Sequence, residues 1–307
     1  MADRSSERQS LLSSVRAALL LGGPLLGLLG GGLMQMQGWP ADAVACVAVT
    51  IWVIVWWVFE PVPIPATSLL PMALFPALGV LPQADVAGAY GSPLILLLLG
   101  GFILSTAMER SGAHRRIALT MVRLFGGASG RTLVLGFMAA AALLSMWISN
   151  TATTLMLLPV ALAVLERAKD ARLATPLLLG IAYAASVGGV GTPIGTPPNL
   201  VFMQVYAETT GSELGFVSWM RWGVPVVLLL LPCLWLWLTR HLAGSGRVEV
   251  PEVGPWTAAE ARVLTVFGLT ALAWITRSEP FGGWSAWLGL EGANDASVAF
   301  VAVVTLF

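Results

Sequence analysis

Long apolar runs recur along most of this 307-residue chain, and they constrain its fold more than any other feature. A helix needs about 20 residues to cross the hydrocarbon layer of a membrane. Hydrophobic residues make up 57% of the sequence and charged residues only 10%, whereas a soluble domain carries about 25% charged residues. A water-soluble fold of this size could not cover so much apolar surface. The sequence therefore predicts an all-α, polytopic integral membrane protein.

Two pairs of neighbouring apolar runs are interrupted by short segments that cannot continue a helix. A polar Ile-Ser-Asn-Thr stretch separates the first pair, and residues 188–199, which hold four glycines and three prolines, separate the second. Non-helical backbone survives at membrane depth only where protein or water satisfies its polar groups. The sequence thus predicts a re-entrant helical hairpin followed by a broken transmembrane helix. The segments expected to enter the membrane are Val15–Met34, Ala41–Phe59, Ala66–Leu81, Pro93–Met108, Thr132–Trp147, Ala152–Leu165, Leu173–Val187, Leu200–Tyr206, Trp219–Thr239, Arg262–Thr276 and Ala296–Phe307.

The positions of the basic residues support the hairpin independently. With the hairpin entering and leaving on one side, all 16 basic residues except Arg221 and Arg277 fall on the side of the N-terminus. If the hairpin crossed the membrane instead, Arg240, Arg247 and Arg262 would move to the opposite side. Because cytoplasmic loops are enriched in Lys and Arg, we expect a cytoplasmic N-terminus and a location in the bacterial plasma (inner) membrane.

The hairpin tip and the break in the following helix carry hydroxyl and amide side chains but no charged residue. These oxygens, with backbone carbonyls, can replace the water around Na⁺. The helix that begins after each interruption directs the positive end of its dipole toward an anion. Secondary transporters build their sites from such broken helices. Because the empty site is neutral, the sequence favours the binding of sodium and an anion together. A purely structural role stays open, since these side chains also cap kinks in membrane helices.

Other functions have little support in the sequence. A formal net charge of zero gives no reason to expect nucleic acid as a partner. Neither interruption contains a His, Glu or Asp that could act in catalysis, so we do not expect an enzyme. Cys46 and Cys233 are interpreted as small apolar residues of helices, and no organic cofactor is expected. Glu60 is interpreted as a solvated residue at the end of a span, and Asp295 as the cap of the last run.

Two motifs resemble the divalent anion:sodium symporter family, which carries di- and tricarboxylates and, in some branches, sulfate. Ser149-Asn150-Thr151 stands at the hairpin tip, and Gly191-Thr192-Pro193-Ile194-Gly195-Thr196-Pro197-Pro198-Asn199 follows in the break. The early spans are also similar to that family. The resemblance implies sodium ligation by Ser145, Ser149, Asn150 and Gly195. The anion would contact Ser149, Asn150, Thr151, Thr196, Pro197 and Asn199.

The resemblance further implies a homodimer that carries sodium together with a C4-dicarboxylate such as succinate by an elevator mechanism. Residues 1–131 would form scaffold spans, 132–172 the hairpin, 173–240 the broken helix and following span, and 241–307 the start of a second repeat. We expect a C-terminally truncated member that holds the first of two inverted repeats. The alternatives are transport of sulfate or another inorganic oxyanion, sodium-independent dicarboxylate exchange, and a non-transporting membrane scaffold.

Overall fold

The computed structural model describes residues 2–125, 129–168, 170–242, 253–278, 282–290 and 292–307, with backbone alone for residues 2–14. Within those ranges every regular element is helical, so the predicted all-α class is confirmed. The chain divides into two compact units, Met1–Ser92 and Pro93–Phe307. Seven segments of the described residues are long and apolar enough to cross a membrane: Val15–Met36, Ala41–Phe59, Gln83–Ser111, Asn150–Ala168, Ala171–Gly191, Phe216–Thr239 and Ala258–Ile275.

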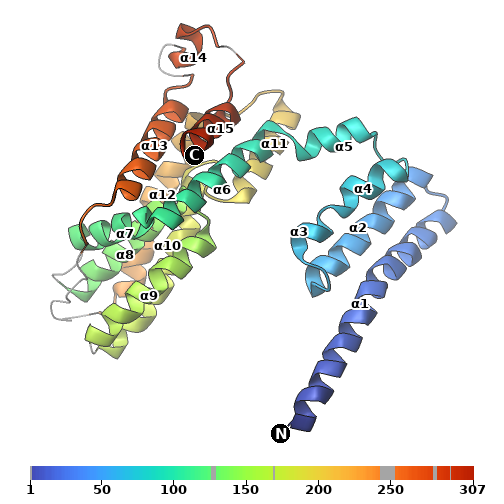
Figure 1. Ribbon diagram of the computed structural model, residues 1–307, viewed down its shortest axis with the longest axis horizontal. Coiled ribbons are helices and arrows are strands. Elements are labelled where there is room, and N and C mark those ends of the chain that lie inside the picture. The colour runs from blue at the N-terminus through green and yellow to red at the C-terminus, as the bar shows by residue number, and fades with distance from the viewer. Residues whose placement is uncertain (1, 126–128, 169, 243–252, 279–281, 291) are drawn as a thin grey trace. The chain divides into compact units, whose positions relative to one another are not determined.

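The first unit is built on a close pair of helices, α1 and α2 (Figure 1). A β-carbon at Gly27 would lie 2.4 Å from the carbonyl oxygen of Ala48, and one at Gly31 would lie 3.2 Å from that of Val44. Glycine therefore permits the two backbones to approach, as small residues commonly do between membrane helices. The helices of this unit are α1 (Ala2–Met36), α2 (Ala41–Phe59), α3 (Ile64–Thr67), α4 (Leu70–Ala77) and α5 (Gln83–Tyr90).

The predicted span Ala66–Leu81 is wrong, because the structure has two short helices there, α3 and α4. Pro71 has no N–H to donate to the carbonyl of Thr67, and Ser68 and Leu69 form a turn between α3 and α4. The second helix ends before Gly79, which has a φ of +70°. The apolar composition of this segment was visible in the sequence, but its prolines divide it.

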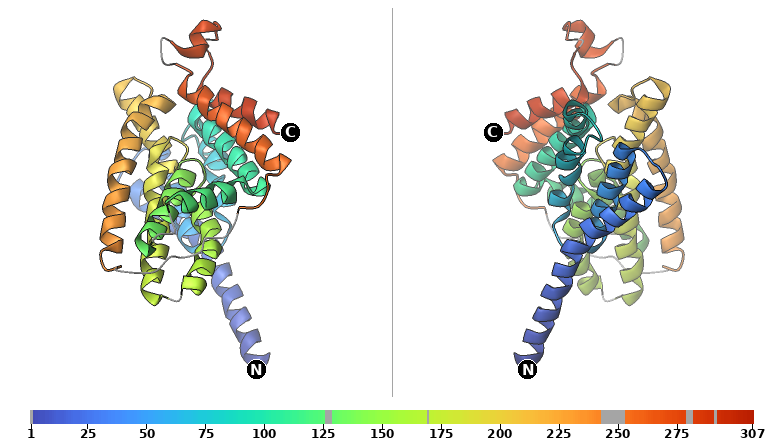
Figure 2. Two further views of the ribbon diagram at one scale, coloured as in Figure 1. Left: turned by 90° about the vertical axis from the view of Figure 1, so that its left-hand side faces the viewer. Right: turned by 90° about the vertical axis from the view of Figure 1, so that its right-hand side faces the viewer.

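The second unit contains two hydrophobic cores. The first lies mainly among α7, α8, α9 and α10, and the second among α6, α11, α13 and α15. Figure 2 shows α13 and α15 lying beside α6. The helices of this unit are α6 (Pro93–Ser111), α7 (Ala113–Phe125), α8 (Gly130–Ser145), α9 (Asn150–Ala168), η1 (Ala171–Leu173), α10 (Ala174–Gly188), η2 (Gly189–Gly191), α11 (Pro197–Thr210), α12 (Phe216–Thr239), α13 (Ala258–Ile275), α14 (Gly283–Trp287) and α15 (Asp295–Thr305).

The hairpin consists of α8 and α9, and α10 runs parallel to α8. A β-carbon at Gly180 would lie 3.1 Å from the Met138 side chain, and one at Gly188 would lie 2.3 Å from the carbonyl oxygen of Ala142. The later residue of α10 thus contacts the later residue of α8, as expected for helices that run in the same direction. As a result, the end of α10 arrives beside the hairpin tip, where the break begins.

The position of the hairpin tip can be measured along α12, which is long enough to cross a membrane. At one end of α12, the carbonyl of Arg131 accepts a 2.8 Å hydrogen bond from Trp235 Nε1, and Arg131 Nε donates to Thr239 Oγ1 at 3.3 Å. The break meets α12 at Gly223, where a β-carbon would lie 2.4 Å from the carbonyl oxygen of Val190. At 1.5 Å per residue, Gly223 lies roughly 24 Å from Thr239, and α12 continues roughly 10 Å beyond it. The tip thus ends part-way along α12, so the predicted helical hairpin and the predicted break in the following helix are confirmed.

Helix α7 was not predicted, because its sequence is rich in arginine. Ala118, Leu119 and Val122 are buried on one side of it, whereas Arg115 and Arg123 are exposed. A short helix with one apolar and one basic face is typical of a helix at a membrane surface.

Asp295 does not cap the last helix as predicted, because Asn294 does so. The Asn294 side chain accepts a 2.9 Å hydrogen bond from the Ser297 N–H. Asp295 instead forms an ion pair with Arg277, with 2.6 Å between Oδ1 and Nε, and its Oδ2 accepts from the Phe216 N–H at 3.2 Å. Asp295 therefore joins the starts of α12 and α15.

Candidate functional site

The hairpin tip brings two of the predicted sodium ligands into direct contact. Helix α8 ends at Ser145 and α9 begins at Asn150. Ser145 Oγ donates a 2.6 Å hydrogen bond to Asn150 Oδ1, and the Ser145 side chain is fully buried. The tight connection between the two helices thus holds a hydroxyl and an amide together inside the protein.

Ser149 and Thr151 flank Asn150 and have different surroundings. The Ser149 Oγ accepts a 3.2 Å hydrogen bond from the Ala152 N–H, and its carbonyl accepts a 2.9 Å bond from the Thr153 N–H. The Ser149 side chain therefore satisfies the Ala152 N–H, one of the groups that the first turn of α9 leaves without a helical partner, and the Ser149 carbonyl accepts the first bond of the helix. Thr151 is exposed on that turn.

In the break, the amide of Asn199 organises the backbone. Its Nδ2 donates hydrogen bonds of 2.8 Å to the carbonyl of Gly189 and 2.8 Å to the carbonyl of Thr192. Asn199 is only 5% exposed. Its donor hydrogens therefore hold the loop closed, and its Oδ1 is the atom left for a ligand.

The tip and the break meet directly. Thr192, which is fully buried, donates from Oγ1 to the carbonyl of Met146 at the tip. A β-carbon at Gly189 would lie 2.6 Å from Asn150 Oδ1, and one at Gly195 would lie 2.4 Å from the carbonyl oxygen of Gly189. The predicted sodium ligands Ser145, Asn150 and Gly195 are thereby gathered around one glycine, and a side chain at Gly189 or Gly195 would fill this space.

Thr196 and Pro197 begin α11 beside Gly195. Thr196 is the N-cap residue, is partly buried, and its side chain makes no capping hydrogen bond. Its hydroxyl is therefore not used in the way that is usual for a threonine at this position. Pro197 is exposed and, with Pro198, has no N–H to offer. An anion at α11 would meet the helix dipole and the Thr196 hydroxyl rather than a set of N–H groups.

The site carries no formal charge, and its polarity comes from backbone and neutral side-chain dipoles. Neither the tip, residues 145–151, nor the break, residues 188–199, contains an ionisable side chain. Among the described residues, no group of three or more His, Cys, Asp or Glu side chains could hold a metal ion. The arrangement therefore suits a monovalent cation bound by neutral oxygens, and does not resemble a carboxylate-rich divalent metal site.

Sequence reasoning missed three residues that shape this region. Thr192 joins the break to the tip, and Trp219 Nε1 donates a 2.8 Å hydrogen bond to the carbonyl of Val190. Trp147, within the tip, contacts three aromatic rings of α12 and α13. Thr192 could have been found from its place in the glycine- and proline-rich break. The tryptophans could not, because their partners lie far away in the sequence.

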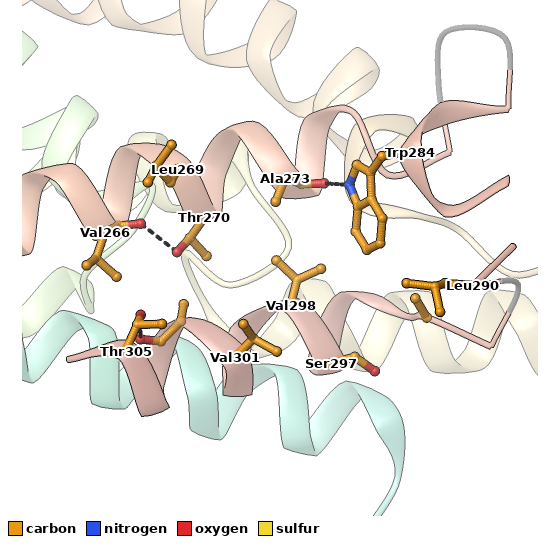
Figure 3. A pocket seen from close by; sticks show the side chains of 12 residues that line it. Val266, Leu269, Thr270, Ala273, Trp284, Leu290, Ser297, Val298, Val301 and Thr305 are labelled. Atoms are coloured by element: carbon orange, nitrogen blue, oxygen red, sulfur yellow. Dashed lines mark hydrogen bonds between the residues drawn. The ribbon is translucent and has the colours of Figure 1, made fainter. Parts of the chain in front are cut away.

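A pocket of about 570 Å³ between α13, α14 and α15 is a different kind of space (Figure 3). Its few polar groups are bonded locally, as where Thr270 Oγ1 donates to the carbonyl of Val266 and Trp284 Nε1 to that of Ala273. An apolar pocket of this kind gives sodium no ligands. Its lining comprises Val266, Leu269, Thr270, Ala273, Trp284, Leu290, Ala293, Ser297, Val298, Val301, Ala302 and Thr305.

An all-helical membrane protein in which a re-entrant hairpin meets a broken helix has the architecture of a secondary transporter. Residues 54–305 match the model of the citrate transporter (CitMHS) family, and the chain belongs to this family. The resemblance to anion:sodium symporters is therefore confirmed at the level of the family. Because the family is one of transporters, the comparison also agrees with the prediction that the chain is not an enzyme.

Curated relatives extend this comparison. Sodium-dependent dicarboxylate transporter SdcS of Staphylococcus aureus strain bovine RF122 / ET3-1 is 36% identical over 324 aligned residues. The same protein of strain NCTC 8325 is also 36% identical. Each alignment covers 98% of this chain and 62% of the relative, so the chain spans less than two thirds of the length of these relatives.

Proposed function

We propose that this protein carries a small dicarboxylate, such as succinate, across the bacterial plasma membrane together with sodium. The observation that supports this most strongly is the meeting of two uncharged, oxygen-rich interruptions around Asn150 and Gly189. The names of the relatives, which describe sodium-dependent dicarboxylate transport, point the same way.

Sodium would bind where the tip and the break touch. Ser145, Ser149 and Asn150 offer side-chain oxygens, and Gly195 offers a backbone carbonyl. The 2.6 Å hydrogen bond between Ser145 and Asn150 holds two of these oxygens close together in the empty site. A bound cation would be ligated by both oxygens, with the Ser145 proton turned away. Neutral ligands leave the positive charge of sodium unbalanced, which favours an anion alongside it.

The anion would lie at the start of α9. Ser149 takes the N–H groups of Ala152 and Thr153, so those of Asn150 and Thr151 are the candidates for a carboxylate. The Thr196 hydroxyl and the Asn199 Oδ1 would complete the contacts from the break, beside Pro197. A carboxylate in this position also gains from the helix dipole.

The two cores of the second unit suggest how the site could move. The hairpin, α10 and α12 share one core, whereas α6, α13 and α15 share the other. We propose that the first group moves as a body past the second, as in an elevator mechanism. The division proposed from the sequence, with residues 132–172 and 173–240 moving, residues 1–131 as scaffold and residues 241–307 beginning a second repeat, matches these cores in part. Helix α7 of residues 1–131 belongs to the first core, and α11 of residues 173–240 belongs to the second. A homodimer is proposed from the family resemblance alone.

Uptake of labelled succinate tests this function. Cells that express the protein should accumulate succinate from a sodium chloride medium, and replacement of sodium by choline should abolish the accumulation. Asn150→Ala should also abolish it, because the variant loses an oxygen ligand and the partner of Ser145. Uptake that is indifferent to the choline replacement would reject sodium coupling. Sodium-dependent uptake of labelled sulfate that unlabelled succinate does not inhibit, with no uptake of labelled succinate, would instead favour an inorganic oxyanion as the substrate.

A further inference from the structure

Trp147 lies where the two cores of the second unit meet. It packs against both cores, although it belongs to the hairpin tip. Its ring stacks on Phe216 with 6.0 Å between centroids and on Trp274 with 6.3 Å, and it meets Phe267 edge-on at 5.1 Å. Phe216 begins α12, and the other two rings belong to α13. The tip is therefore joined through one side chain to elements outside the hairpin.

The rings that receive Trp147 are themselves firmly held. Phe216 and Trp274 are each 1% exposed and stack on one another at 4.8 Å. Trp274 Nε1 donates a 2.8 Å hydrogen bond to the carbonyl of Asp295, whose side chain accepts from the Phe216 N–H and pairs with Arg277. The backbone carbonyl and the side chain of Asp295 thus fix the orientation of Phe216 and Trp274, which we call the aromatic platform.

The neighbouring residue, Met146, attaches the tip to the break. Its carbonyl accepts from Thr192 Oγ1, and a β-carbon at Gly191 would lie 2.4 Å from the end of its side chain. Two adjacent residues therefore hold the tip from two sides, Met146 on the break and Trp147 on the platform. Ser145 and Asn150, the two hydrogen-bonded ligand candidates, lie immediately before and shortly after them.

We propose that Trp147 is a positioning residue for the sodium site. It touches neither ion nor substrate, and its stacking on Trp274 and Phe216 keeps the tip in the geometry in which Ser145 and Asn150 face the break. This inference rests on the proposed function, because it assumes that sodium binds at the tip. Without the ring, the tip is less ordered in the sodium-free protein. Part of the binding free energy of sodium is then used to order the tip, so the affinity for sodium falls.

Sodium-dependent heat stability of the purified protein tests this proposal. The midpoint temperature of thermal unfolding is measured in the presence of succinate at a series of sodium concentrations. Choline chloride keeps the ionic strength constant. Trp147→Ala should raise the sodium concentration for half of the stabilisation about tenfold, equivalent to about 1.4 kcal/mol. Trp147→Phe keeps a stacking ring and should restore a value within about twofold of the parent protein. If Trp147→Ala does not purify in a folded state, Phe267→Leu removes only the edge contact and should give a shift of about threefold.

Trp235→Ala is the matched control, because Trp235 binds the opposite end of the same hairpin through the carbonyl of Arg131. It should lower the midpoint temperature without sodium but leave the sodium concentration for half-effect unchanged. An unchanged half-effect in Trp147→Ala, or an equal rise in Trp235→Ala, would overturn the positioning role. If the parent protein itself shows no response to sodium, the proposed function fails and this inference fails with it.

Discussion

At the scale of single residues, the site depends on side chains in which one polar atom bonds the protein and another is offered to a ligand. Asn199 was predicted from the sequence as an anion ligand, and the structure shows its Nδ2 bonded to two carbonyls of the break. Residue type and membrane position could predict that an amide lies here. The direction of its hydrogen bonds could not be predicted, because it depends on how residues 189–192 fold back toward α11.

Removal of the Asn199 amide should destabilise the break. Asn199→Ala leaves the buried carbonyls of Gly189 and Thr192 without their donor, and should lower the free energy of unfolding by about 2–4 kcal/mol. Gln204→Ala, which removes an exposed amide, should change it by less than about 0.5 kcal/mol. Denaturation in detergent measures both. Equal stability of the two variants would show that Asn199 does not hold the loop.

Gly195 should not tolerate a side chain. In Gly195→Ala the new β-carbon would lie 2.4 Å from the carbonyl oxygen of Gly189, and backbone cannot yield as a flexible side chain can. We expect a loss of about 1–3 kcal/mol in stability. Gly268→Ala in α13 meets no atom within 4 Å and should be neutral or stabilising by up to about 1 kcal/mol. Thermal unfolding of the two variants compares them, and a stable Gly195→Ala would argue against the close packing of the break.

At the scale of elements, the strongest predictions came from the length and interruption of apolar runs. The hairpin and the broken helix follow from these, because several prolines, glycines and polar residues close together interrupt a helix, whereas the single prolines of α1 and α9 do not. Elements outside the apolar runs were missed. Helix α7 is joined to α13 by Arg116, which is buried and whose Nη2 lies 3.0 Å from Glu260 Oε2. A contact between residues so far apart leaves no local signal in the sequence.

Arg116 should therefore matter far more than its neighbour. Its Nη2 also donates to the carbonyls of Gly254 at 3.0 Å and Pro255 at 2.6 Å, and its guanidinium covers the Trp256 ring. Arg116→Leu should lower the midpoint temperature by roughly 5 °C, because the start of α13 loses its attachment to α7. Arg115→Leu, at an exposed position, should leave the midpoint unchanged. A scan of intrinsic fluorescence against temperature would decide, and equal midpoints would contradict the role given to Arg116.

At the scale of the whole molecule, the sequence predicted the class, the interrupted elements and the family. It did not predict that the second unit has two cores, since core membership depends on contacts between α6 and α15 or between α8 and α10. The predicted division at residues 131, 172 and 240 stays a prediction. The side of the membrane on which each loop lies, predicted from arginine placement, also stays a prediction and can be measured.

Thiol labelling from each face of sealed vesicles tests the re-entrant topology. In a background with Cys46→Ala and Cys233→Ala, Leu124→Cys and Glu166→Cys should react with an impermeant reagent from the same face, because the hairpin returns to the side it entered. Thr210→Cys, at the end of α11, should react from the opposite face. All three positions are exposed, so accessibility does not limit the assay. Reaction of positions 124 and 166 from opposite faces would show that the hairpin crosses the membrane.

We propose that the hairpin tip and the helix break together bind sodium and a dicarboxylate. The most direct measurement is the affinity of the purified protein for succinate, in sodium chloride and in choline chloride, for the parent protein and for Asn150→Ala. Gln83→Ala, which removes an exposed amide far from the tip in sequence, is the control. We predict an affinity at least about tenfold higher in sodium for the parent protein and for Gln83→Ala, and no sodium dependence for Asn150→Ala. Equal affinity in both salts for the parent protein, or full sodium dependence in Asn150→Ala, would contradict it.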